Sequence, residues 1–559
     1  YKEVYLLSEE SRIQIIPLGG MGEIGKNMMA IRYADTIIVI DAGLMFPEDE
    51  LLGIDVVIPD ITYLVENKDK VKAILLTHGH EDHVGALPYV LRELNTPVYG
   101  SKLTLGLVRE KLKDHNLNNV KLNTVRPRDI VRIGEFEIEF IRVSHSIPDA
   151  MAIAVHTPIG IILHTGDIKL DQTPVDGQIV DFRKFAELGE KGVLLMASDS
   201  TNADRPGFTA SEKIVGKTFD ELFGKCEGRI IVTTFASNVH RIQQVVTTAE
   251  KYKRKVAIVG RSMINNVRIS VELGYMHIED NTLIEMEDIN KYPHNEIVIV
   301  TTGSQGEPMS ALTRMATADH RWIGIEPGDT VIISATPIPG NEKLVSKTVD
   351  LLFKQGAEVI YERDMGVHVS GHAAQEELKI LINLIRPRYF LPVHGEYRHL
   401  KKHAKIAESL GIPRSRIFVP DNGQVIEISR KKALITNKVT AGNVLVDGLG
   451  VGDVGNIVLR DRKQLSQDGI MIVVVTMDKN LGRVIAGPDI VSRGFVYVRE
   501  SEELIEDAKT KVKEALDICE KRNITEWAAI KSQVRDRLSK HLYDKTGRRP
   551  MILPIIMEV

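Results

Sequence analysis

The first 170 residues contain short apolar runs that alternate with polar positions in the two-residue period of β-strands. IQIIPL (13–18), MMAIRY and TIIVIDAG open the chain as strands joined by tight turns. Alternating strands and helices follow, with strands predicted at AILLT (73–77), IEFIRVS (138–144), AIAVHTP (152–158) and GIILHTGD (160–167). Strands that face a core from two sides predict a sheet sandwich flanked by helices.

After about residue 210 the pattern changes to repeated strand–helix units. RIIVTTFAS leads into a helix near 239–252, and KVAIVGR, EIVIVTTGSQG and DTVIISATP continue the series. Such units predict a doubly wound parallel sheet. Histidine-containing motifs that resemble those of the first 210 residues return at 368–396. We therefore expect 211–365 to be a domain inserted between 1–210 and 366–449.

The remainder of the chain predicts a linker at 450–465 and a small α/β domain at 466–559. Its expected elements are strands at GIMIVVVTMD and RGFVYVRE, polar helices at 502–521 and 525–541, and a final strand at PMILPIIMEV.

Composition and charge narrow the class of protein. The 559 residues, 43% hydrophobic and 26% charged, are typical of a globular protein of several domains. A formal net charge of -4 excludes a strong global attraction to nucleic acid, so binding to a polyanion requires a local basic groove. Two cysteines, Cys226 and Cys519, predict a reducing cytoplasm. The apolar run 470–475 is too short to cross a bilayer, and no membrane contact is expected.

The most specific chemical signal is THGHEDH at 77–83. An extended chain places His78 and His80 on the same side, where both imidazoles can reach one metal ion. Asp82 and His83 lie just beyond, on the turn into a helix expected to begin near Val84, and can reach a second ion. Imidazole with carboxylate suits Zn²⁺ or Mn²⁺.

Further ligands must come from the ends of other strands, and His145, Asp167 and His394 occupy such positions. Asp167 can bridge two ions through its two oxygens. A bridged pair of cations lowers the pKa of a shared water and clamps both oxygens of a phosphodiester displacement. Asp41, at the end of another strand, is expected to orient a ligand histidine, the alternative being an ordinary strand-end turn.

The set DAG, HxHxDH, SH, TGD and a late VHGE resembles the metallo-β-lactamase superfamily, and the inserted domain is similar to that of the β-CASP nucleases. ASNVHR (236–241), TGSQGEP (302–308), HVSGHAAQEE (368–377) and RPMILPIIMEV resemble bacterial ribonuclease J. The resemblance implies an αββα sandwich, with His78, His80 and His145 on one metal, Asp82, His83 and His394 on the other, and Asp167 between them.

The segment HVSGHAAQ can offer a hydroxyl, backbone amides and an imidazole to one phosphate. His372 is the candidate to stabilise or protonate the leaving oxygen, and Asp82 is the second expected catalytic residue. A capped helix start with a solvated His372 is the structural alternative. The resemblance implies that the nucleotide at the cleavage site is bound by His368, Val369, Ser370, Gly371 and His372.

Other polar residues follow strands of the inserted domain. With the backbone amides at the helix start, they can form a pocket for a 5′-monophosphate. The pocket residues are Ser237, Asn238, Val239 (through its backbone), Arg261, Ser262 and Ser304. Asn238 serves equally well as a helix N-cap, and the two interpretations remain open. The resemblance further implies a structural Ca²⁺ held partly by backbone carbonyls at Leu52, Ile54 and Asp447.

Two motifs invite misinterpretation. Gly20, Gly22 and Gly25 match the dinucleotide-binding spacing, but a strand rather than a helix follows, so we expect a tight hairpin beside the active site. The basic run RHLKKHAK (398–405) is most often a solvated helix face, and it can alternatively help to line an RNA channel.

Three functions follow as hypotheses. The first is a ribonuclease with two Zn²⁺ or Mn²⁺ per subunit that cuts single-stranded RNA internally and from a 5′-monophosphate end. The second is a weakly active paralogue that serves mainly as the structural partner of an active ribonuclease J. The third is a hydrolase of small thioesters or lactams, which the large insertion disfavours. The resemblance implies a homodimer or tetramer, assembly with a ribonuclease J paralogue, dimerisation through the C-terminal domain and contacts with other RNA-decay proteins.

Overall fold

The computed structural model describes residues 12–48, 50–306, 310–338, 341–361, 365–478, 483–496, 502–522, 524 and 526–559. Two compact units are formed, one by the described parts of 1–46 and 56–444 and the other by those of 47–55 and 445–559. Within the described residues, no helix combines the length and the apolar character needed to cross a bilayer.

Two sheets face each other in the first unit. The first sheet has eight strands in the order β23 (Ala433–Lys438), β22 (Gln424–Ile428), β1 (Ile13–Gly19), β3 (Met28–Tyr33), β4 (Thr36–Ile40), β6 (Val71–Leu75), β7 (Val98–Gly100) and β8 (Leu122–Thr124).

The second sheet has six strands in the order β20 (Tyr389–Val393), β13 (Val193–Asp199), β12 (Gly160–His164), β11 (Met151–Thr157), β10 (Phe136–Arg142) and β9 (Ile130–Ile133).

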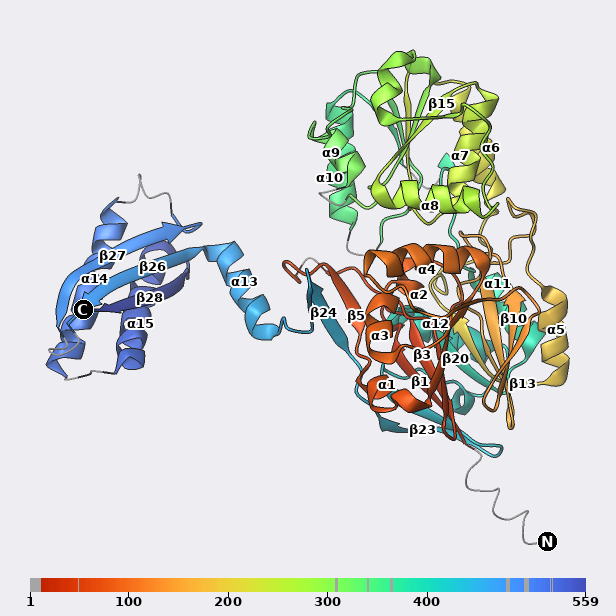
Figure 1. Ribbon diagram of the computed structural model, residues 1–559, viewed down its shortest axis with the longest axis horizontal. Coiled ribbons are helices and arrows are strands. Elements are labelled where there is room, and N and C mark those ends of the chain that lie inside the picture. Colours follow the sequence, from red (N-terminus) through yellow and green to blue (C-terminus); the bar gives the residue numbers. More distant parts are fainter. Residues whose placement is uncertain are drawn as a thin grey trace, which may run out of the picture. The chain divides into compact units, whose positions relative to one another are not determined.

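Alternation along these strands explains the sandwich. Leu195 and Ala197 of β13 lie in the core between the two sheets, while Met196 faces the opposite way into a second core. That second core is closed by α5 (Phe182–Lys191), α11 (Gln375–Ile385) and α12 (Tyr397–Ser409). Because both faces are buried, the strands are continuous apolar runs. Figure 1 shows α1 (Thr62–Glu66), α3 (Leu87–Leu94) and α4 (Lys102–Asp114) beside the first sheet.

A third sheet, parallel throughout, is built from the segment between β13 and β20. Its strand order is β16 (Leu283–Ile284), β15 (Lys255–Val259), β17 (Ile297–Thr301), β14 (Ile230–Thr233), β18 (Thr330–Ile333) and β19 (Glu358–Ile360). Since β13 and β20 pair directly in parallel, this sheet is inserted between two neighbouring strands of the sandwich.

Helices cover both faces of the third sheet (Figure 1). One core contains residues of α6 (Lys213–Phe223), α7 (Val239–Lys251) and α8 (Arg261–Glu272). The other contains residues of α9 (Ala311–Ala316) and α10 (Glu342–Lys354). This arrangement is the doubly wound one that the strand–helix pattern predicts.

The second unit contains a three-stranded sheet, β27 (Val484–Arg493), β26 (Ile470–Met477) and β28 (Met551–Glu558). Helices α14 (Glu502–Lys521) and α15 (Trp527–Thr546) pack on one face of it. The strand predicted at RGFVYVRE (493–500) is wrong over residues 494–496, because β27 ends at Arg493. Residues 497–500 lie outside the described residues. The segment predicted as a linker contains α13 (Asn456–Asp468).

Candidate metal centre

The seven candidate donors come from segments that follow strands at one edge of the sandwich. His78 and His80 follow β6, His145 follows β10, Asp167 follows β12, and His394 follows β20. Asp82 and His83 lie on the short helix α2 (Glu81–Val84), which begins at Glu81 and not at Val84 as the sequence suggested. The helical turn points both side chains back towards the strand ends.

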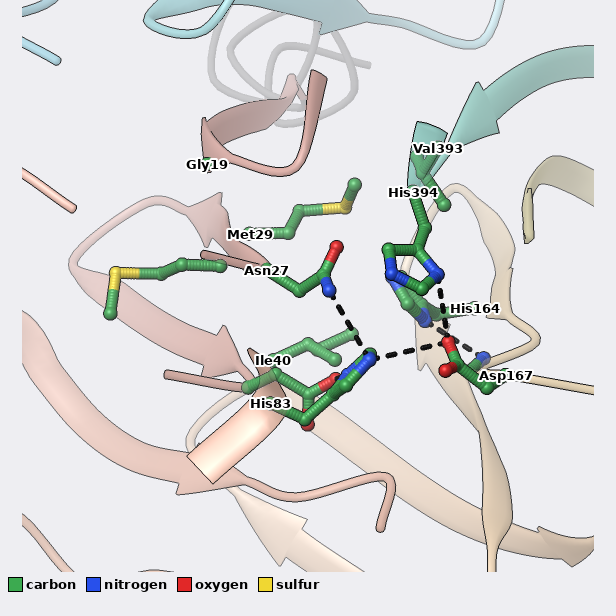
Figure 2. A pocket seen from close by; sticks show the side chains of 12 residues that line it. Gly19, Asn27, Met29, Ile40, His83, His164, Asp167, Val393 and His394 are labelled. Atoms are coloured by element: carbon green, nitrogen blue, oxygen red, sulfur yellow. Dashed lines mark hydrogen bonds and ion pairs between the residues drawn. The ribbon is translucent and has the colours of Figure 1, made fainter. Parts of the chain in front are cut away.

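These donors form two groups that share Asp167. The ligand atoms of His78, His80, His145 and Asp167 all lie within 4.8 Å of one another. Those of Asp82, His83, His394 and Asp167 meet the same limit. Asp167 Oδ2 lies 3.5 Å from Nε2 of both His78 and His145, whereas Oδ1 lies 3.3 Å from His83 Nε2. The two oxygens of one carboxylate therefore face different histidines. Figure 2 shows Asp167 with His83 and His394, the histidines of the second group.

Three histidines have Nδ1 engaged by the protein, so that Nε2 faces the centre. His83 Nδ1 donates to Asp41 Oδ2 at 2.7 Å, and His145 Nδ1 donates to the carbonyl of Gly371 at 2.7 Å. The Thr77 hydroxyl donates its proton to Asp41 at 2.8 Å and therefore accepts from His78 Nδ1 at 3.0 Å. An acceptor on one ring nitrogen with the other directed inward is typical of metal-ligating histidines.

Asp41 thus orients His83, as the sequence predicted, and does more. Its φ of 60° is left-handed, and both carboxylate oxygens are engaged, one by the Thr77 amide at 2.8 Å and the other by Thr77 and His83. Asp41 connects both groups of donors, because Thr77 in turn holds His78.

Charge and burial in this centre suit cations. Burial is the largest effect on three histidines and lowers their pKa, to about 4 for His80 and well below the usual value for His78 and His145. These imidazoles are neutral near pH 7, which metal ligation requires. Burial also lowers the pKa of His83 and His394, but the charges and hydrogen bonds of the surrounding carboxylates, Asp167 foremost, together outweigh burial and leave both pKa values well raised.

The donor set fits a pair of divalent ions on one further observation. His78 Nε2 is buried and has no hydrogen-bond partner among the described residues, although a buried polar nitrogen without a partner is costly. A metal ion held by the first group would satisfy this atom. Carboxylates and imidazoles in this proportion suit Zn²⁺ and Mn²⁺.

His372 stands beside the centre rather than in solvent. Its Nδ1 donates to Asp199 Oδ2 at 2.7 Å, which leaves Nε2 directed at Asp167 Oδ2, 3.9 Å away. Burial lowers the pKa of His372, but the charges of Asp199 and Asp167 outweigh it and raise the pKa. A raised pKa favours the protonated ring, which carries a proton on Nε2, as a donor to a leaving oxygen requires.

Gly371 allows this segment to approach the centre. A Cβ at Gly371 would lie 2.7 Å from His145 Cε1, so no larger residue fits without moving the ligand. Its neighbour Ser370 accepts from Asn202 Nδ2 at 2.8 Å, and Asn202 also donates to the carbonyl of His372 at 2.9 Å. On the other side, the buried Arg241 donates to the carbonyl of Val367 at 3.3 Å and to Glu212 at 2.5 Å.

Sequence reasoning missed two residues of the site, Asp199 and Asn27. Asp199 ends β13, and the parallel pairing of β12, β13 and β20 brings it beside Asp167 and His394. An acid at the end of an apolar strand, as at Asp41 and Asp167, was the signal that could have found it. Asn27 Nδ2 lies 3.2 Å from His83 Nε2 (Figure 2) and gives no such signal.

The glycine-rich turn is confirmed as a hairpin beside the centre. β1 and β3 pair antiparallel around it, and Gly20, Gly22 and Gly25 all have positive φ. The carbonyl of Gly20 accepts from the amide of His394 at 3.1 Å. The basic helix α12 exposes Arg398, Lys402 and Lys405 and buries His399 and His403 on its other side.

The residues expected around a 5′-phosphate follow neighbouring strands β14, β15 and β17, so they meet at one edge of the third sheet. Arg261 is exposed, with Nη2 3.4 Å from Asp114, and the adjacent Ser262 is exposed as well. Ser304 is buried. Asn238 accepts from the amide of Arg241 at 3.2 Å, so its side chain is a helix cap. Ser237 is half-buried and Val239 is buried at the start of α7.

The positions expected to bind Ca²⁺ lie together in the second unit. The carbonyl of Leu52 accepts from Arg462 Nη1 at 2.9 Å, and Arg462 Nη2 donates to Asp447. Ile54 follows in the same turn, with its side chain buried.

A sandwich of two sheets with metal-binding loops at one edge, and a parallel domain inserted between two of its strands, defines a β-CASP protein of the metallo-β-lactamase class. Four family models match the chain: "Metallo-beta-lactamase superfamily" at 21–185, "Ribonuclease J, beta-CASP domain" at 227–352, "Zn-dependent metallo-hydrolase RNA specificity domain" at 356–420 and "Ribonuclease J C-terminal domain" at 457–559.

Relatives that match over nearly the whole chain narrow the family to which it belongs. The chain is 50% identical to "Ribonuclease J2" of Bacillus subtilis over 98% of its length and 99% of the relative's. It is 45% identical to "Ribonuclease J 2" of Staphylococcus saprophyticus and 46% identical to that of Staphylococcus aureus. The chain belongs to the ribonuclease J family.

The fold also matches a crystal structure of a protein of unknown function from Enterococcus faecalis V583. That chain is 18% identical, with a TM-score of 0.54, and the match covers 75% of the present chain and all of the other. At this identity the likeness concerns the fold alone.

Proposed function

We propose that this protein is a metal-dependent ribonuclease that cuts single-stranded RNA internally and degrades it from a 5′-monophosphate end. The observation that carries the proposal is the convergence of six donors around Asp167, with the Nε2 of His372 directed at the same carboxylate. The seven donors are complete, so the geometry gives no reason to prefer a weakly active structural partner.

His78, His80 and His145 would hold one Zn²⁺ or Mn²⁺, and Asp82, His83 and His394 the other, with Asp167 shared. Two such ions would supply activation of a water and neutralisation of charge on the phosphate. The chain's own residues do the rest. Asp82, whose side chain is 30% exposed against 3% for Asp167, faces the open side and can orient the attacking water.

His372 is the proton donor to the leaving 3′ oxygen. Asp199 accepts from Nδ1 and fixes the ring, so the protonated imidazole directs its second proton, on Nε2, at the site of the reaction. Ser370 and the backbone around Gly371 lie beside it and provide polar groups for the scissile phosphate.

The direct test is turnover by the isolated chain. Metal content and cleavage of 5′-monophosphorylated single-stranded RNA are measured on the same preparation. We expect two divalent ions for each chain and turnover that a chelator abolishes and added Mn²⁺ restores. A metal-loaded chain that leaves RNA intact would contradict the proposal.

Arg261 is proposed to recognise the 5′-phosphate. It stands at the first position of α8, exposed at the edge where the loops after β14, β15 and β17 meet. Arg261→Ala should lose the preference for monophosphorylated over hydroxylated 5′ ends, by about tenfold for one charge-assisted contact. Arg268→Ala, a change to an exposed arginine on the same helix, should leave the preference unaltered. An unaltered preference in Arg261→Ala would remove the assignment.

A homodimer is proposed through the sheet of the second unit. Along β28 every second side chain is exposed and apolar: Leu553 by 46%, Ile555 by 38% and Met557 by 47%. The parallel register pairs Ile472 with Leu553 and Val474 with Ile555, so half-buried residues of β26 extend this face. A contiguous apolar face of this kind is typical of an interface.

Ile555→Glu should therefore convert the dimer to a monomer, because a carboxylate cannot be buried without a partner. The mass in solution is measured by light scattering after gel filtration. Ile380→Glu, placed on an exposed position of α11, is the matched control and should leave the mass unchanged. A dimer that survives Ile555→Glu would place the interface elsewhere.

Cytoplasmic localisation is proposed on the state of the cysteines. Cys226 and Cys519 are both free, and Cys519 is buried. Burial raises the pKa of the Cys519 thiol, so it is kept in its unreactive form. Free thiols of this kind suit a reducing compartment.

A further inference from the structure

A cavity lies beside the metal centre, and of its lining residues the reaction as described uses Ser370 alone. Its volume is about 210 Å³, several times the share of one water molecule in the liquid. Its walls are the loop 205–210, the segment that leads to His372, and Thr336 in the loop after β18. Because Ser370 lines the cavity and stands two residues before His372, the cavity lies next to the reaction site.

Phe208 forms part of this cavity and is 67% exposed. Single exposed apolar residues are common, but Phe208 differs from most of them because its loop is fixed. Thr209 Oγ1 donates to the carbonyl of His372 at 2.7 Å, and the amide of Thr209 donates to Glu377 at 2.7 Å. The backbone on the other side is fixed as well, because the carbonyls of Arg205 and Gly207 accept from Gln375 and Glu376 at 3.0 Å each.

The loop therefore presents an aromatic ring in a prearranged position, tied directly to the backbone of His372. A loop that is already fixed loses little conformational entropy when a ligand binds to it. Gly207, which precedes the ring in the chain, has a φ of 75°, a left-handed conformation that glycine adopts readily.

The character of the remaining walls suits a nucleotide. Of the described residues that line the cavity, none is acidic and one, Arg205, carries a positive charge. Hydroxyls and an imidazole complete the lining, from Thr336, Ser370 and His368. Burial lowers the pKa of His368 to about 3, so its ring is neutral and acts as a hydrogen-bonding group rather than a charge.

We propose that this cavity binds the base of a nucleotide next to the scissile phosphate, with Phe208 stacked on the base. The inference rests on the ribonuclease function proposed above and adds the position at which single-stranded RNA is gripped. Stacking on an aromatic ring accepts any base, because each has a π-face, so the cavity favours unpaired RNA over a particular sequence. A base within a duplex is stacked on its neighbours and cannot enter.

The experiment combines Phe208→Ala with RNA oligonucleotides that carry one abasic residue at successive positions around a fixed cleavage site. For intact single-stranded RNA, Phe208→Ala should lower kcat/KM by about 5- to 150-fold, the range of one base–aromatic stack. Phe208→Trp should retain activity, because the ring is kept. In the wild type, an abasic residue at one position should lower kcat/KM by a similar factor. In Phe208→Ala, an abasic residue at that position should lower kcat/KM no further.

Phe353→Ala, a change to a 50% exposed phenylalanine on α10, is the matched control and should cleave RNA as the wild type does. Unaltered kcat/KM in Phe208→Ala overturns the proposal, as does an equal abasic penalty at every position in both proteins. If the wild type still cleaves RNA when either result is found, only the cavity proposal fails and the proposed ribonuclease function stands. Wild-type protein that neither binds nor cleaves RNA overturns both.

An independent inference concerns the residues expected to hold Ca²⁺. The guanidinium of Arg462 donates to the Leu52 carbonyl at 2.9 Å and to the Asp447 carboxylate, so it engages two of the three positions expected to hold the ion, including the one side-chain oxygen among them. A Cβ at Gly53 would lie 2.6 Å from Arg462 Nη1, so the arginine packs closely on this turn. The donor set does not fit a metal ion while this guanidinium occupies it.

We infer that Arg462 serves as a built-in cation that ties α13 to the turn 51–55, and that the second unit needs no Ca²⁺. The amide of Gly448 donates to Asp55 at 2.7 Å and closes the same turn from the other side. A guanidinium is permanently charged and needs no ion from solution, so the contact does not depend on Ca²⁺ concentration.

Thermal unfolding with added Ca²⁺ and with a Ca²⁺ chelator tests this. The wild-type unfolding temperature should be the same in both conditions, whereas Arg462→Ala should lower it by about 2–8 °C. Arg460→Ala, on the same helix, should have no effect. Stabilisation of the wild type by Ca²⁺ that disappears in Asp447→Ala would overturn the inference, and so would an Arg462→Ala protein as stable as the wild type.

Discussion

Replacing Asp167 by asparagine should reduce RNA cleavage by at least about a thousandfold, a loss of about 4 kcal/mol of transition-state stabilisation. The substitution keeps the shape of the side chain and removes the negative charge that faces His78 and His145 through one oxygen and His83 through the other. The same charge is the main one that raises the pKa of His83 and His394. We expect fewer than two bound metal ions as well.

Cleavage of labelled RNA and metal content are measured on the same sample of Asp167→Asn. Asp350→Asn, a change to an exposed carboxylate on α10, is the matched control and should behave as the wild type. An Asp167→Asn protein that is folded and still cleaves RNA at the wild-type rate would exclude the shared-carboxylate centre.

His372→Ala should reduce cleavage by about 10²- to 10⁴-fold, the usual contribution of a positioned general acid, while metal content stays at the wild-type level. The two readouts separate because His372 Nε2 is 3.9 Å from Asp167 and its Nδ1 is committed to Asp199. Asp199→Asn should give a smaller loss of the same kind, since the ring remains and only its orientation is released.

His277→Ala, a change to an exposed histidine of the inserted domain, should leave both readouts unchanged. If RNA with a leaving oxygen replaced by sulfur, which needs no protonation, is cleaved equally well by His372→Ala and the wild type, the acid role is supported. If the loss in His372→Ala is the same for both substrates, His372 does not protonate the leaving group.

Much of the fold follows from local patterns. Buried strands such as β1, β3 and β10 are apolar runs bounded by turn residues, and a run of that kind determines its own secondary structure with little help from the rest of the chain. Elements with an exposed or irregular pattern were found less well. β27 is mostly exposed, so it lacks the alternation that indicates a strand.

The ligand cluster at 78–83 was also visible in the chain, because its members are close neighbours. His145, Asp167 and His394 needed only the observation that each follows an apolar strand. Asp199 was not found, since the pairing of β13 with β20 joins residues almost two hundred positions apart. Nor could the sequence indicate that Arg462 reaches Leu52 across four hundred residues.

Sequence alone determined most of the strands and helices, because hydrophobic periodicity and turn chemistry act over a few residues. Tertiary structure decided which nitrogen of each histidine faces inward, that His372 is aimed by Asp199, and that a cavity opens beside Phe208. Those features depend on distances between side chains from separate strands, and only the packing of the sheets against each other sets such distances.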